Sequence, residues 1–403
     1  MDNLRGGKPT RRIVTETVSQ PSLAYVSQGK LHLHGDADRT IESAFGRSLR
    51  ERAAQIHNRH AWKTAGRGAQ FMRGMLWPET GGDPSEFRIL ITSVSRGREP
   101  GELLYSLETD AISGLFLVDA TGFEQRLFHT ADYRVRHIAL SPSGDTLAVS
   151  VLHSNMTANL GVMNGDGSDF REISEGDSLD LAPRWVPGGK YLVFQTAGLG
   201  RDAAGRFSGY GPFAVQQLDL DSGDLATLAE DADSDLLGPQ LTPSGDLYYI
   251  RRPYAGKRKP VNPLTIMKDT LLFPFRMSYA IFQFFNFFSM RYTGKPLATA
   301  RGAVGRTPDL KQMMIWGNLV DVDQARRENS GEADAPSLVP SSWQLVRQSA
   351  AGKDVVAKGV LSFDLGPDGS VVCSNGSAVH RIQPDGKRER LLVGNMIEQV
   401  AWL

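Results

Sequence analysis

The chain has 403 residues, of which 40% are apolar and 22% are charged, and its 45 basic residues balance its 45 acidic ones. A net charge of zero argues against a protein that binds nucleic acid with its whole surface, although it does not bear on local patches. The phenylalanines of residues 271–290 are too dense and too helix-periodic for a platform that stacks bases, so we expect no nucleic-acid partner. The single cysteine, Cys373, excludes an intramolecular disulfide framework. Because it lies within a predicted strand, we expect a buried and inert thiol.

Residues 1–20 are expected to form a flexible N-terminal arm. They include several basic residues, but they are not followed by the apolar run that a secretory signal requires. We therefore expect the protein to remain in the cytoplasm.

One hairpin pattern occurs four times along the chain. Its first copy, LSPSGDTLAVS at 140–150, has apolar runs on both sides of a turn built from Pro, Ser, Gly and Asp, the residues that favour tight turns. The other copies are WVPGGKYLVFQ at 185–195, LTPSGDLYYI at 241–250 and LGPDGSVVCS at 365–374. Four copies of one hairpin indicate a repeat architecture.

The repeat predicts a propeller, whose blades each contain four antiparallel strands. Candidate third strands begin at Gly29, Gly114, Asn159, Phe213, Ser342 and Ser377, and a candidate fourth strand follows each of them. Innermost strands are expected at 70–77, 135–140, 181–185, 236–241, 360–365 and 396–403. The last has no hairpin behind it, and residues 22–27 supply the missing second strand.

We therefore predict an all-β fold, a six-bladed β-propeller over residues 21–403 that is closed by its N- and C-terminal strands and carries helical insertions. The first blade is expected to combine residues 21–46 with residues 396–403, which would leave no exposed sheet edge at the closure.

The S-P-x-G hairpin and the D-x-x-G turn after it resemble the TolB-type, WD40-like propeller repeat, which also occurs in the propellers of prolyl-oligopeptidase relatives. The resemblance covers residues 21–250 and 342–403 and implies a fold rather than an activity. The family's usual Asp in the hairpin turn is present at Asp368, whereas the other copies carry Ser143, Gly189 and Ser244. TolB itself is periplasmic with an extra N-terminal domain, and we recognise neither feature here, so no TolB function is carried over.

The first interruption of the repeat is a basic helix predicted at residues 47–63. Ser48 and Glu51 match a capping box, and apolar residues follow at helical spacing, so one face is expected to pack on the propeller. The basic patch of this helix consists of Arg47, Arg50, Arg59 and Lys63. Two interpretations stay open: a solvated helix that plugs one end of the ring, and a patch that faces an anion.

The second interruption, residues 251–311, is the stretch most informative about function. Between residues 251 and 301 it carries ten basic residues against one acidic residue, Asp269, and its centre is rich in phenylalanine. Such an apolar segment is not expected to face bare water. The residues expected to contact a membrane or a partner are Phe275, Phe282, Phe284, Phe285, Phe287, Phe288, Arg276, Lys257, Arg258 and Lys259.

Three interpretations of this insertion stay open: an elaborate cap on the propeller, a surface for a protein partner, and peripheral contact with an anionic membrane surface. A single bilayer span is excluded because both ends return to neighbouring strands of one blade, so one crossing would leave the chain on the wrong side. An interfacial helix is compatible with the pattern, with its aromatic residues at the acyl boundary and its basic flanks on anionic headgroups.

No motif of a known catalytic class is present: there is no G-x-S-x-G elbow, P-loop, dinucleotide fingerprint or H-E-x-x-H sequence. Some six-bladed propellers hydrolyse esters or lactones with a metal ion held in the central channel by side chains at the ends of inner strands. The candidates by position alone are Asp132, Asp177, Asp180, Asp235 and Glu398. We expect no catalytic residue, metal or cofactor, and keep a metal-dependent hydrolase as the alternative.

Residues 323–340 are polar and rich in Gly, Pro and acids, which predicts a flexible loop. Together these patterns predict a non-catalytic scaffold that mediates protein–protein interaction. We expect its Phe-rich insertion to dock on a protein assembly or on the inner face of the membrane.

Overall fold

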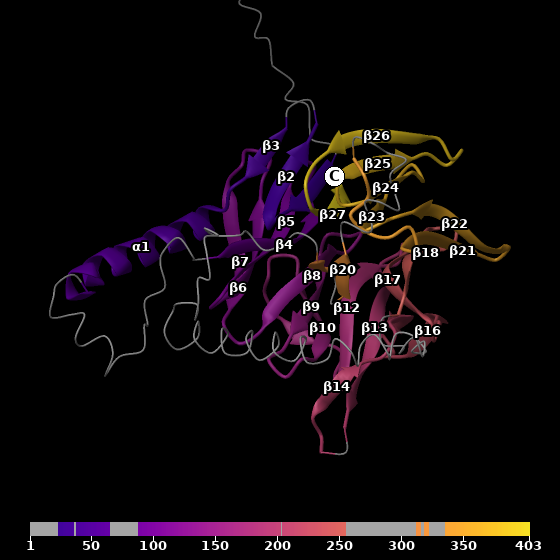
Figure 1. Cartoon of the computed structure of the whole chain (residues 1–403), viewed down its shortest axis with the longest axis horizontal. Helices are drawn as coiled ribbons and strands as arrows, with labels where there is room; N and C mark the ends of the chain where they lie inside the picture. The colour runs from indigo at the N-terminus through magenta and orange to yellow at the C-terminus, as the bar shows by residue number, and fades with distance from the viewer. Residues whose placement is uncertain are drawn as a thin grey trace, which may run out of the picture.

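The structure, a computed structural model, describes residues 23–35, 38–64, 88–202, 204–254, 312–315, 318–321 and 335–403, and for 56–64, 312–315 and 318–321 it describes the backbone alone. Strands dominate, and successive sheets lie beside one another around the molecule (Figure 1). The helix α1 (Ala44–Thr64) projects to the left in that view. The all-β prediction is confirmed.

The two ends of the described chain meet in one four-stranded sheet. Its strands are β1 (Leu23–Ser27), β2 (Lys30–His34), β3 (Arg39–Ile41) and β27 (Ile397–Trp402). Their order is β27-β1-β2-β3, and Ala24 lies opposite Ala401. Because β1 and β27 pair with each other as antiparallel strands, the edges along which they meet are not available to another chain.

A second four-stranded sheet follows α1. It consists, in order, of β4 (Ile89–Arg96), β5 (Leu103–Thr109), β6 (Ser113–Val118) and β7 (Glu124–Thr130). The prediction that its innermost strand lies at 70–77 is wrong, because β4 holds that place; residues 70–77 are outside the described residues. The turn after β4 lacks the S-P-x-G pattern, so the repeat does not mark this hairpin.

The largest sheet has nine strands and contains two copies of the repeat. The first copy is β8 (Arg134–Leu140), β9 (Thr146–Leu152), β10 (Ala158–Asn164) and β11 (Arg171–Glu172). The second is β12 (Ser178–Trp185), β13 (Tyr191–Arg201), β15 (Ala214–Asp219) and β16 (Leu225–Ala229). A single parallel bridge between Ala158 and Leu179 joins the two copies, and β14 (Phe207–Tyr210) extends β13 into a projecting hairpin (Figure 1).

Two more four-stranded sheets follow. One is β17 (Ser234–Leu241), β18 (Leu247–Pro253), β21 (Gln344–Ser349) and β22 (Gly352–Lys358). The other is β23 (Ser362–Leu365), β24 (Val371–Ser374), β25 (Ala378–Ile382) and β26 (Arg388–Val393). A separate pair, β19 (Gln312–Ile315) and β20 (Asn318–Asp321), lies between β18 and β21 in the sequence.

The turn glycines explain why the hairpin pattern recurs. Each adopts a positive φ that only glycine tolerates easily, with values of +78° at Gly144, +75° at Gly189, +88° at Gly245 and +77° at Gly369. In the first copy the Gly144 amide also donates to the Ser141 carbonyl at 2.9 Å, which closes the turn. The repeated Gly is therefore a requirement of turn geometry.

The first strand of each repeat, which we call the inner strand, contacts the inner strand of the next repeat. The contacts run from β4 to β8, β12, β17, β23 and β27, and then return to β4. Three successive inner strands also share a bulge, whose residue has a positive φ: His137 in β8, Ala182 in β12 and Gly238 in β17. The shared bulge fixes an alignment among these strands that the sequence alone does not give.

Side chains tie each repeat to its neighbour by hydrogen bonds to the backbone. The bonds join Gln399 to Val94 (3.1 Å), Ser93 to Ile138 (3.1 Å), Trp185 to Ala139 (3.0 Å), Gln195 to Gly238 (2.7 Å), Gln240 to Phe363 and Leu365 (3.2 Å each), and Asp364 to Trp402 (2.9 Å). Since bulges leave backbone groups unpaired within their own sheet, these polar side chains satisfy groups that would otherwise be buried without partners.

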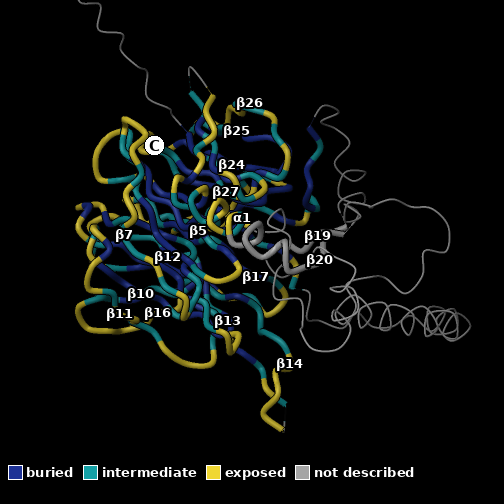
Figure 2. Tube along the Cα trace, turned by 90° about the vertical axis from the view of Figure 1, so that its left-hand side faces the viewer, coloured by how far each residue is buried: buried dark blue, intermediate teal, exposed yellow. Residues whose placement is uncertain are grey.

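The buried residues lie in the interior of the molecule (Figure 2), and their apolar clusters join side chains of adjacent sheets. Tyr105, Tyr249, Phe116 and Phe194 are its largest fully buried side chains. Cys373 is buried in β24, as expected for an inert thiol.

The helix α1 begins earlier than predicted. Ser43 is its cap, since its hydroxyl accepts a hydrogen bond from the Gly46 amide at 3.1 Å, so the prediction of a capping box at Ser48 is wrong. The Glu124 carboxylate of β7 also accepts the amides of Ala44 and Phe45 at 2.9 and 2.8 Å. A cap supplied by a distant strand is invisible in a local sequence pattern.

The end of the loop expected at 323–340 is ordered, so that prediction is wrong for residues 335–340. Ala335, Leu338 and Val339 are buried, and the Leu338 amide donates to the Asn375 carbonyl at 2.9 Å. Residues 323–334 lie outside the described residues. Within residues 335–340, these three apolar residues are buried together with Ser337.

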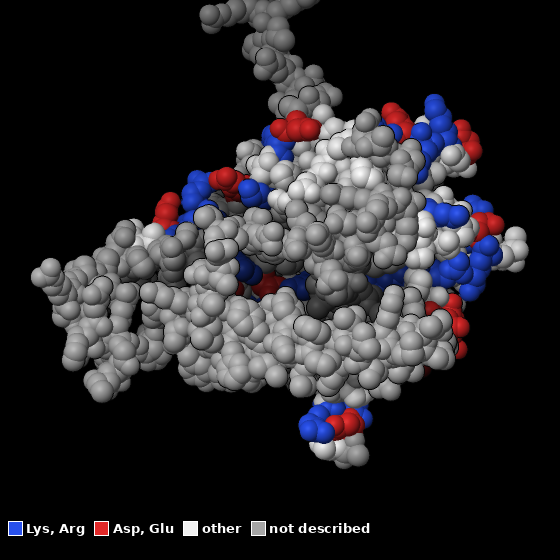
Figure 3. Space-filling model, viewed as in Figure 1, with Lys and Arg blue, Asp and Glu red and all other residues white. Residues whose placement is uncertain are grey.

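Most outer strands carry charges. We use this name for the fourth strand of each repeat: β3, β7, β11, β16, β22 and β26. Figure 3 shows basic and acidic side chains together along the right-hand side, where β22 and β26 lie. Charged residues on an outer strand discourage pairing with another chain.

Candidate functional site

The five acidic residues proposed as channel ligands do not converge. Asp132 and Asp177 are exposed, and Asp177 pairs with Arg201 at 2.7 Å, which lowers the pKa of its carboxyl group through a hydrogen bond. Among the described residues, no group of three His, Cys, Asp or Glu side chains is arranged to hold a metal ion. The geometry of the described acids therefore does not favour the metal-dependent hydrolase.

We number the repeats from the sheet that contains β1, so that the third begins at β8, the fourth at β12 and the fifth at β17. Asp235 belongs to a buried ion pair in the fifth repeat. Its carboxylate accepts from Arg252 Nε at 2.9 Å and from the Phe213 amide at 3.1 Å, and the Arg252 guanidinium lies 5.0 Å above the ring of Trp343. Burial lowers the pKa of Arg252, while Asp235 opposes this shift. The Asp235 carboxylate thus already has a cation and a backbone amide of the protein as partners, which is typical of a structural acid.

Asp180 is the other buried acid, and its surroundings differ. It is 5% exposed, and it accepts hydrogen bonds from the hydroxyls of Ser174 at 2.6 Å and Thr196 at 2.7 Å. Among the described residues, no basic side chain forms an ion pair with it. A buried carboxylate is ordinarily compensated by a cation.

The bulge shared by β8, β12 and β17 aligns the three strands, so the residues that correspond to Asp180 in the neighbouring repeats can be identified. Two residues before the bulge, β8 has Val135 (0% exposed), β12 has Asp180 and β17 has Leu236 (1% exposed). The residue across from Val135 is Val151, whereas Thr196 lies across from Asp180. An aliphatic core pair in one repeat is thus a carboxylate–hydroxyl pair in the next, and such departures from a local rule are expected at functional sites.

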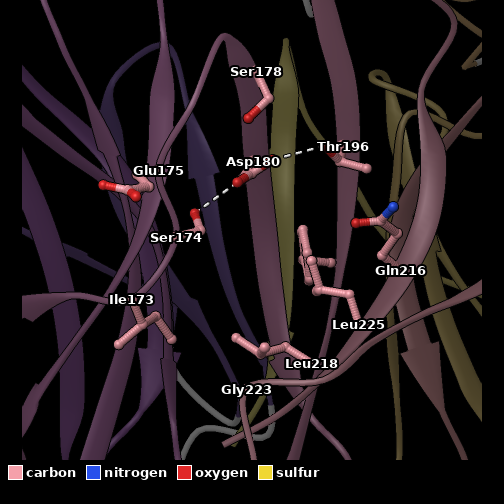
Figure 4. A pocket seen from close by; sticks show the side chains of 11 residues that line it. Ile173, Ser174, Glu175, Ser178, Asp180, Thr196, Gln216, Leu218, Gly223 and Leu225 are labelled. Carbon is pink, nitrogen blue, oxygen red and sulfur yellow. Dashed lines mark hydrogen bonds between the residues drawn. The ribbon is translucent and has the colours of Figure 1, made fainter.

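Asp180 lies in a pocket between the third and fourth repeats (Figure 4). The pocket has a volume of about 290 Å³ and is lined by Ile173, Ser174, Glu175, Ser178, Asp180, Phe194, Thr196, Gln216, Leu218, Gly223 and Leu225. Its polar groups include two acids and no base, and its apolar part is formed by aliphatic side chains and one phenylalanine. We call it the Asp180 pocket.

The local strand lengths explain why the Asp180 pocket is open. β11 has only two residues, whereas β7 has seven and β22 has seven. Residues 173–175 follow β11 and form one wall of the pocket, and they stay bonded to β10: the Ile173 amide donates to the Leu160 carbonyl at 2.8 Å, and the Ser174 hydroxyl accepts from the Leu160 amide at 2.9 Å. The short β11 thus leaves this wall to a segment held to β10 by one backbone and one side-chain hydrogen bond.

A second group of charges includes residues of several inner strands. Arg136 of β8 pairs with Glu108 of the neighbouring strand β5 at 2.8 Å, and Arg184 of β12 lies 3.4 Å from Asp364 of β23. Desolvation by the surrounding protein, together with these two arginines, lowers the pKa of His137 to about 3.

Glu398 lies on the inner strand β27 and is accessible to solvent. Surrounding protein atoms remove part of its hydration and raise the pKa of its carboxyl group, although Arg136 opposes the shift. Glu398, one of the predicted channel ligands, is thus close enough to Arg136 to interact with its charge. This arrangement is that of a network of opposite charges and differs from a set of metal ligands.

The predicted membrane or partner contacts, which run from Lys257 to Phe288, all lie outside the described residues. In the basic helix, Arg47 and Arg50 are accessible to solvent, and Arg47 lies 3.7 Å from Glu42. The side chains of Arg59 and Lys63 are outside the description. Among the residues described, no helix combines the length and apolar character needed to cross a bilayer.

Known structures resemble this fold at low sequence identity. TolB from Acinetobacter baumannii superposes with a TM-score of 0.50 at 13% identity, over 95% of this chain and 66% of the TolB chain. The fold is that of a TolB-like β-propeller. This propeller spans about two thirds of that TolB chain, and the likeness concerns the fold alone.

Two other similar structures have lower scores. A chain of the nidogen/laminin complex gives a TM-score of 0.49 at 8% identity, over 94% of this chain and 97% of that one. The tricorn protease gives 0.45 at 11% identity, over 94% of this chain and 34% of that one. No protein-family model matches the sequence, and neither does any curated protein.

Asp180 was predicted by position alone, as a channel ligand, and its pocket was not predicted. The pocket also needs Ser174, Thr196 and Leu225, which come from other parts of the chain. A usable signal was present: the segment DLAP contains an acid where the matching segment LLGP of the fifth repeat has a leucine.

Proposed function

We propose that this TolB-like propeller has six blades and is a non-catalytic scaffold for a protein partner in the cytoplasm. Support for six blades comes from the cycle of contacts among β4, β8, β12, β17, β23 and β27, together with the pairing of β1 with β27. The side-chain ties between repeats make such a frame rigid, and rigid frames suit recognition by the loops and edges that they carry.

The observation that carries this proposal is the position of the long insertion. It leaves after β18 and returns at β21, and these strands pair directly, with Arg251 opposite Gln344. Both roots are anchored: the Tyr254 amide donates to the Asp233 carbonyl at 2.9 Å, and Trp343 packs beneath Arg252. The fifth repeat is therefore complete without the insertion, which leaves that segment available for docking.

The same proposal includes peripheral docking on an anionic membrane surface through the basic, Phe-rich insertion. Its support is the sequence of residues 257–290, in which basic residues flank a segment rich in phenylalanine. Each basic residue near such a surface contributes about 1 kcal/mol of attraction.

Deletion of residues 257–308, bridged by a Gly/Ser linker, tests the proposal. The deletion variant should fold like the full chain, because the pairing of β18 with β21 is kept. The full chain should capture a defined partner from its host and sediment with anionic vesicles, and the deletion variant should do neither.

A matched variant separates apolar from electrostatic docking. Replacing Phe284, Phe285 and Phe288 by serine keeps every basic residue and should abolish vesicle binding if the aromatic residues insert. A stoichiometric divalent metal together with ester or lactone hydrolysis by the purified full chain would overturn the non-catalytic role.

A further inference from the structure

We propose that the Asp180 pocket binds a free primary amine with a straight apolar chain, with the ammonium group at Asp180 and the chain along the apolar floor of the pocket. This inference goes beyond the scaffold function and depends neither on it nor on the long insertion. It gives the pocket a small-molecule ligand of one chemical class, an alkylammonium ion.

The acidic end of the pocket selects a cation. Asp180 is 5% exposed, and its two carboxylate oxygens accept from the hydroxyls of Ser174 and Thr196 at 2.6 and 2.7 Å. Glu175 adds a second carboxylate at the wall, and among the described residues no Lys, Arg or His lines the pocket. A buried carboxylate is ordinarily compensated by a cation, and each of its oxygens can accept a second hydrogen bond. An ammonium group supplies both the charge and the donors.

The floor of the pocket is apolar and belongs to one face of the fourth repeat. Thr196 lies opposite Asp180, and Phe194, two residues away on β13, points to the same side. Leu218 of β15 continues this face, because it lies opposite Leu192, two residues before Phe194. Phe194 is 1% exposed and Leu218 is 6% exposed. Figure 4 shows Asp180 and Glu175 toward one end of the pocket and Leu218 toward the other.

The strand register gives the pocket an elongated shape. Asp180 and Ala214 lie in one row across β12, β13 and β15, and Leu218 lies four residues farther along β15. At the spacings of a sheet, the backbones of Asp180 and Leu218 are therefore about 16 Å apart. Both side chains line the pocket between them, and Leu225 lies opposite Leu218. A straight chain can thus follow the floor from the acidic end to the apolar end.

The volume of the pocket limits the size of the ligand. At about 290 Å³ it is close to the lower limit of roughly 300 Å³ for small-molecule sites. A metal ion would leave the apolar floor without a contact, whereas an alkyl chain buries that surface.

Titration of the full chain at constant ionic strength, followed by ligand-detected NMR, tests this proposal. Hexylamine is the probe, and 1-hexanol and hexanoate have the same chain without the positive charge. Hexylamine should bind about tenfold more tightly than 1-hexanol, and hexanoate should bind most weakly. Equal affinities for hexylamine and 1-hexanol, or no binding of hexylamine at millimolar concentration, would overturn the proposal.

Two further ligands test the shape of the site and the source of the ammonium group. Butylamine should bind roughly tenfold more weakly than hexylamine, since each methylene removed from water adds up to about fourfold in affinity. Nα-acetyllysine methylamide has the same ammonium group on a four-carbon stem, but peptide groups replace the end of the chain, so it should bind no more tightly than butylamine. Tighter binding of this compound than of hexylamine would assign the site to a lysine side chain of a partner and overturn the free amine.

Two variants assign the two ends of the ligand. D180N removes the charge at the acidic end and should weaken butylamine and hexylamine alike, by about tenfold. L225A shortens the apolar end and should weaken hexylamine severalfold while it leaves butylamine unchanged. Unchanged binding of hexylamine by D180N would contradict the proposal.

A matched pair of exposed acids keeps the test independent of folding. E175Q changes an exposed residue of the pocket wall and should weaken hexylamine severalfold, whereas E389Q, on the exposed outer strand β26, should leave its binding unchanged. An equal effect of the two variants would show that the amine follows the overall charge of the surface and would overturn the site. Capture of a partner through the insertion would be unaffected by that result.

Discussion

Asp180 and Asp235 are buried acids on neighbouring inner strands, and they are held in opposite ways. Asp235 has a buried arginine and a backbone amide as partners, and it lies at the root of the long insertion. Asp180 has two hydroxyls, faces a pocket, and occupies a position where the adjacent repeats have Val135 and Leu236. The first acid has its cation within the chain, whereas the described residues supply no cation to the second.

This difference determines how much each acid contributes to the stability of the fold. Removing one charge of a closed pair leaves the other buried without compensation, which is strongly destabilising. An acid bonded only to hydroxyls can lose its charge with little effect on folding, because a neutral amide still forms part of the same hydrogen bonds. The same chemical change should therefore have unequal effects at the two positions.

The largest effect is expected for D235N. The variant keeps the hydrogen bond from the Phe213 amide but removes the carboxylate charge that faces the buried Arg252, so the free energy of unfolding should fall by about 3–5 kcal/mol. Urea unfolding measures this change. The double variant D235N/R252M should recover part of the loss, and a double variant less stable than D235N would show that the charge pair is not the cause.

The second-largest effect on stability is expected when a side-chain hydrogen bond between two repeats is removed. Gln240 is buried, accepts from the Leu365 amide and donates to the Phe363 carbonyl, so Q240L leaves two backbone groups unsatisfied. We expect a loss of about 1–3 kcal/mol in the same urea measurement. The exposed Gln125 of β7 provides the control, and equal stability of Q240L and Q125L would contradict the role given to these ties.

D180N should change stability least among the buried positions. Its amide oxygen can accept from one of the two hydroxyls, so the free energy of unfolding should fall by no more than about 1 kcal/mol. Urea unfolding of D180N and D235N under the same conditions compares the two losses in free energy of unfolding. A loss as large as that of D235N would mean that the acid is a structural element.

The pH dependence sharpens the comparison for the exposed inner-strand acid Glu398. Its folded-state pKa is raised above the usual 4.5, so the native protein binds this proton more tightly than the unfolded chain, and ionised Glu398 destabilises the fold as pH rises. E398Q should therefore be more stable than the wild type at neutral pH, and the difference should disappear near about pH 4. A gain that stays constant across this pH range would contradict the assignment.

Much of the fold could be predicted from sequence because turn chemistry repeats. The P-x-G element of the hairpins marked the strand pairs around Gly144, Gly245 and Gly369, whose positive φ values only glycine adopts easily. β4 escaped prediction because its hairpin lacks that pattern, and the α1 cap escaped it because Glu124 lies far away in the sequence.

The candidate site was less predictable for a related reason. Which side chains meet at Asp180 depends on the short β11 and on the register set by the bulge at Ala182, and neither is a local property of the sequence. The acid was identifiable by position, but its hydroxyl partners and its pocket follow from packing between two repeats.

The double variant D180V/T196V tests most directly whether the fold depends on Asp180. It copies the Val135–Val151 pair of the preceding repeat into the same register, and it leaves Ser174 to accept from the Leu160 amide. We predict a free energy of unfolding, measured in urea, equal to or above that of the wild type. A loss of more than about 2 kcal/mol would contradict the account.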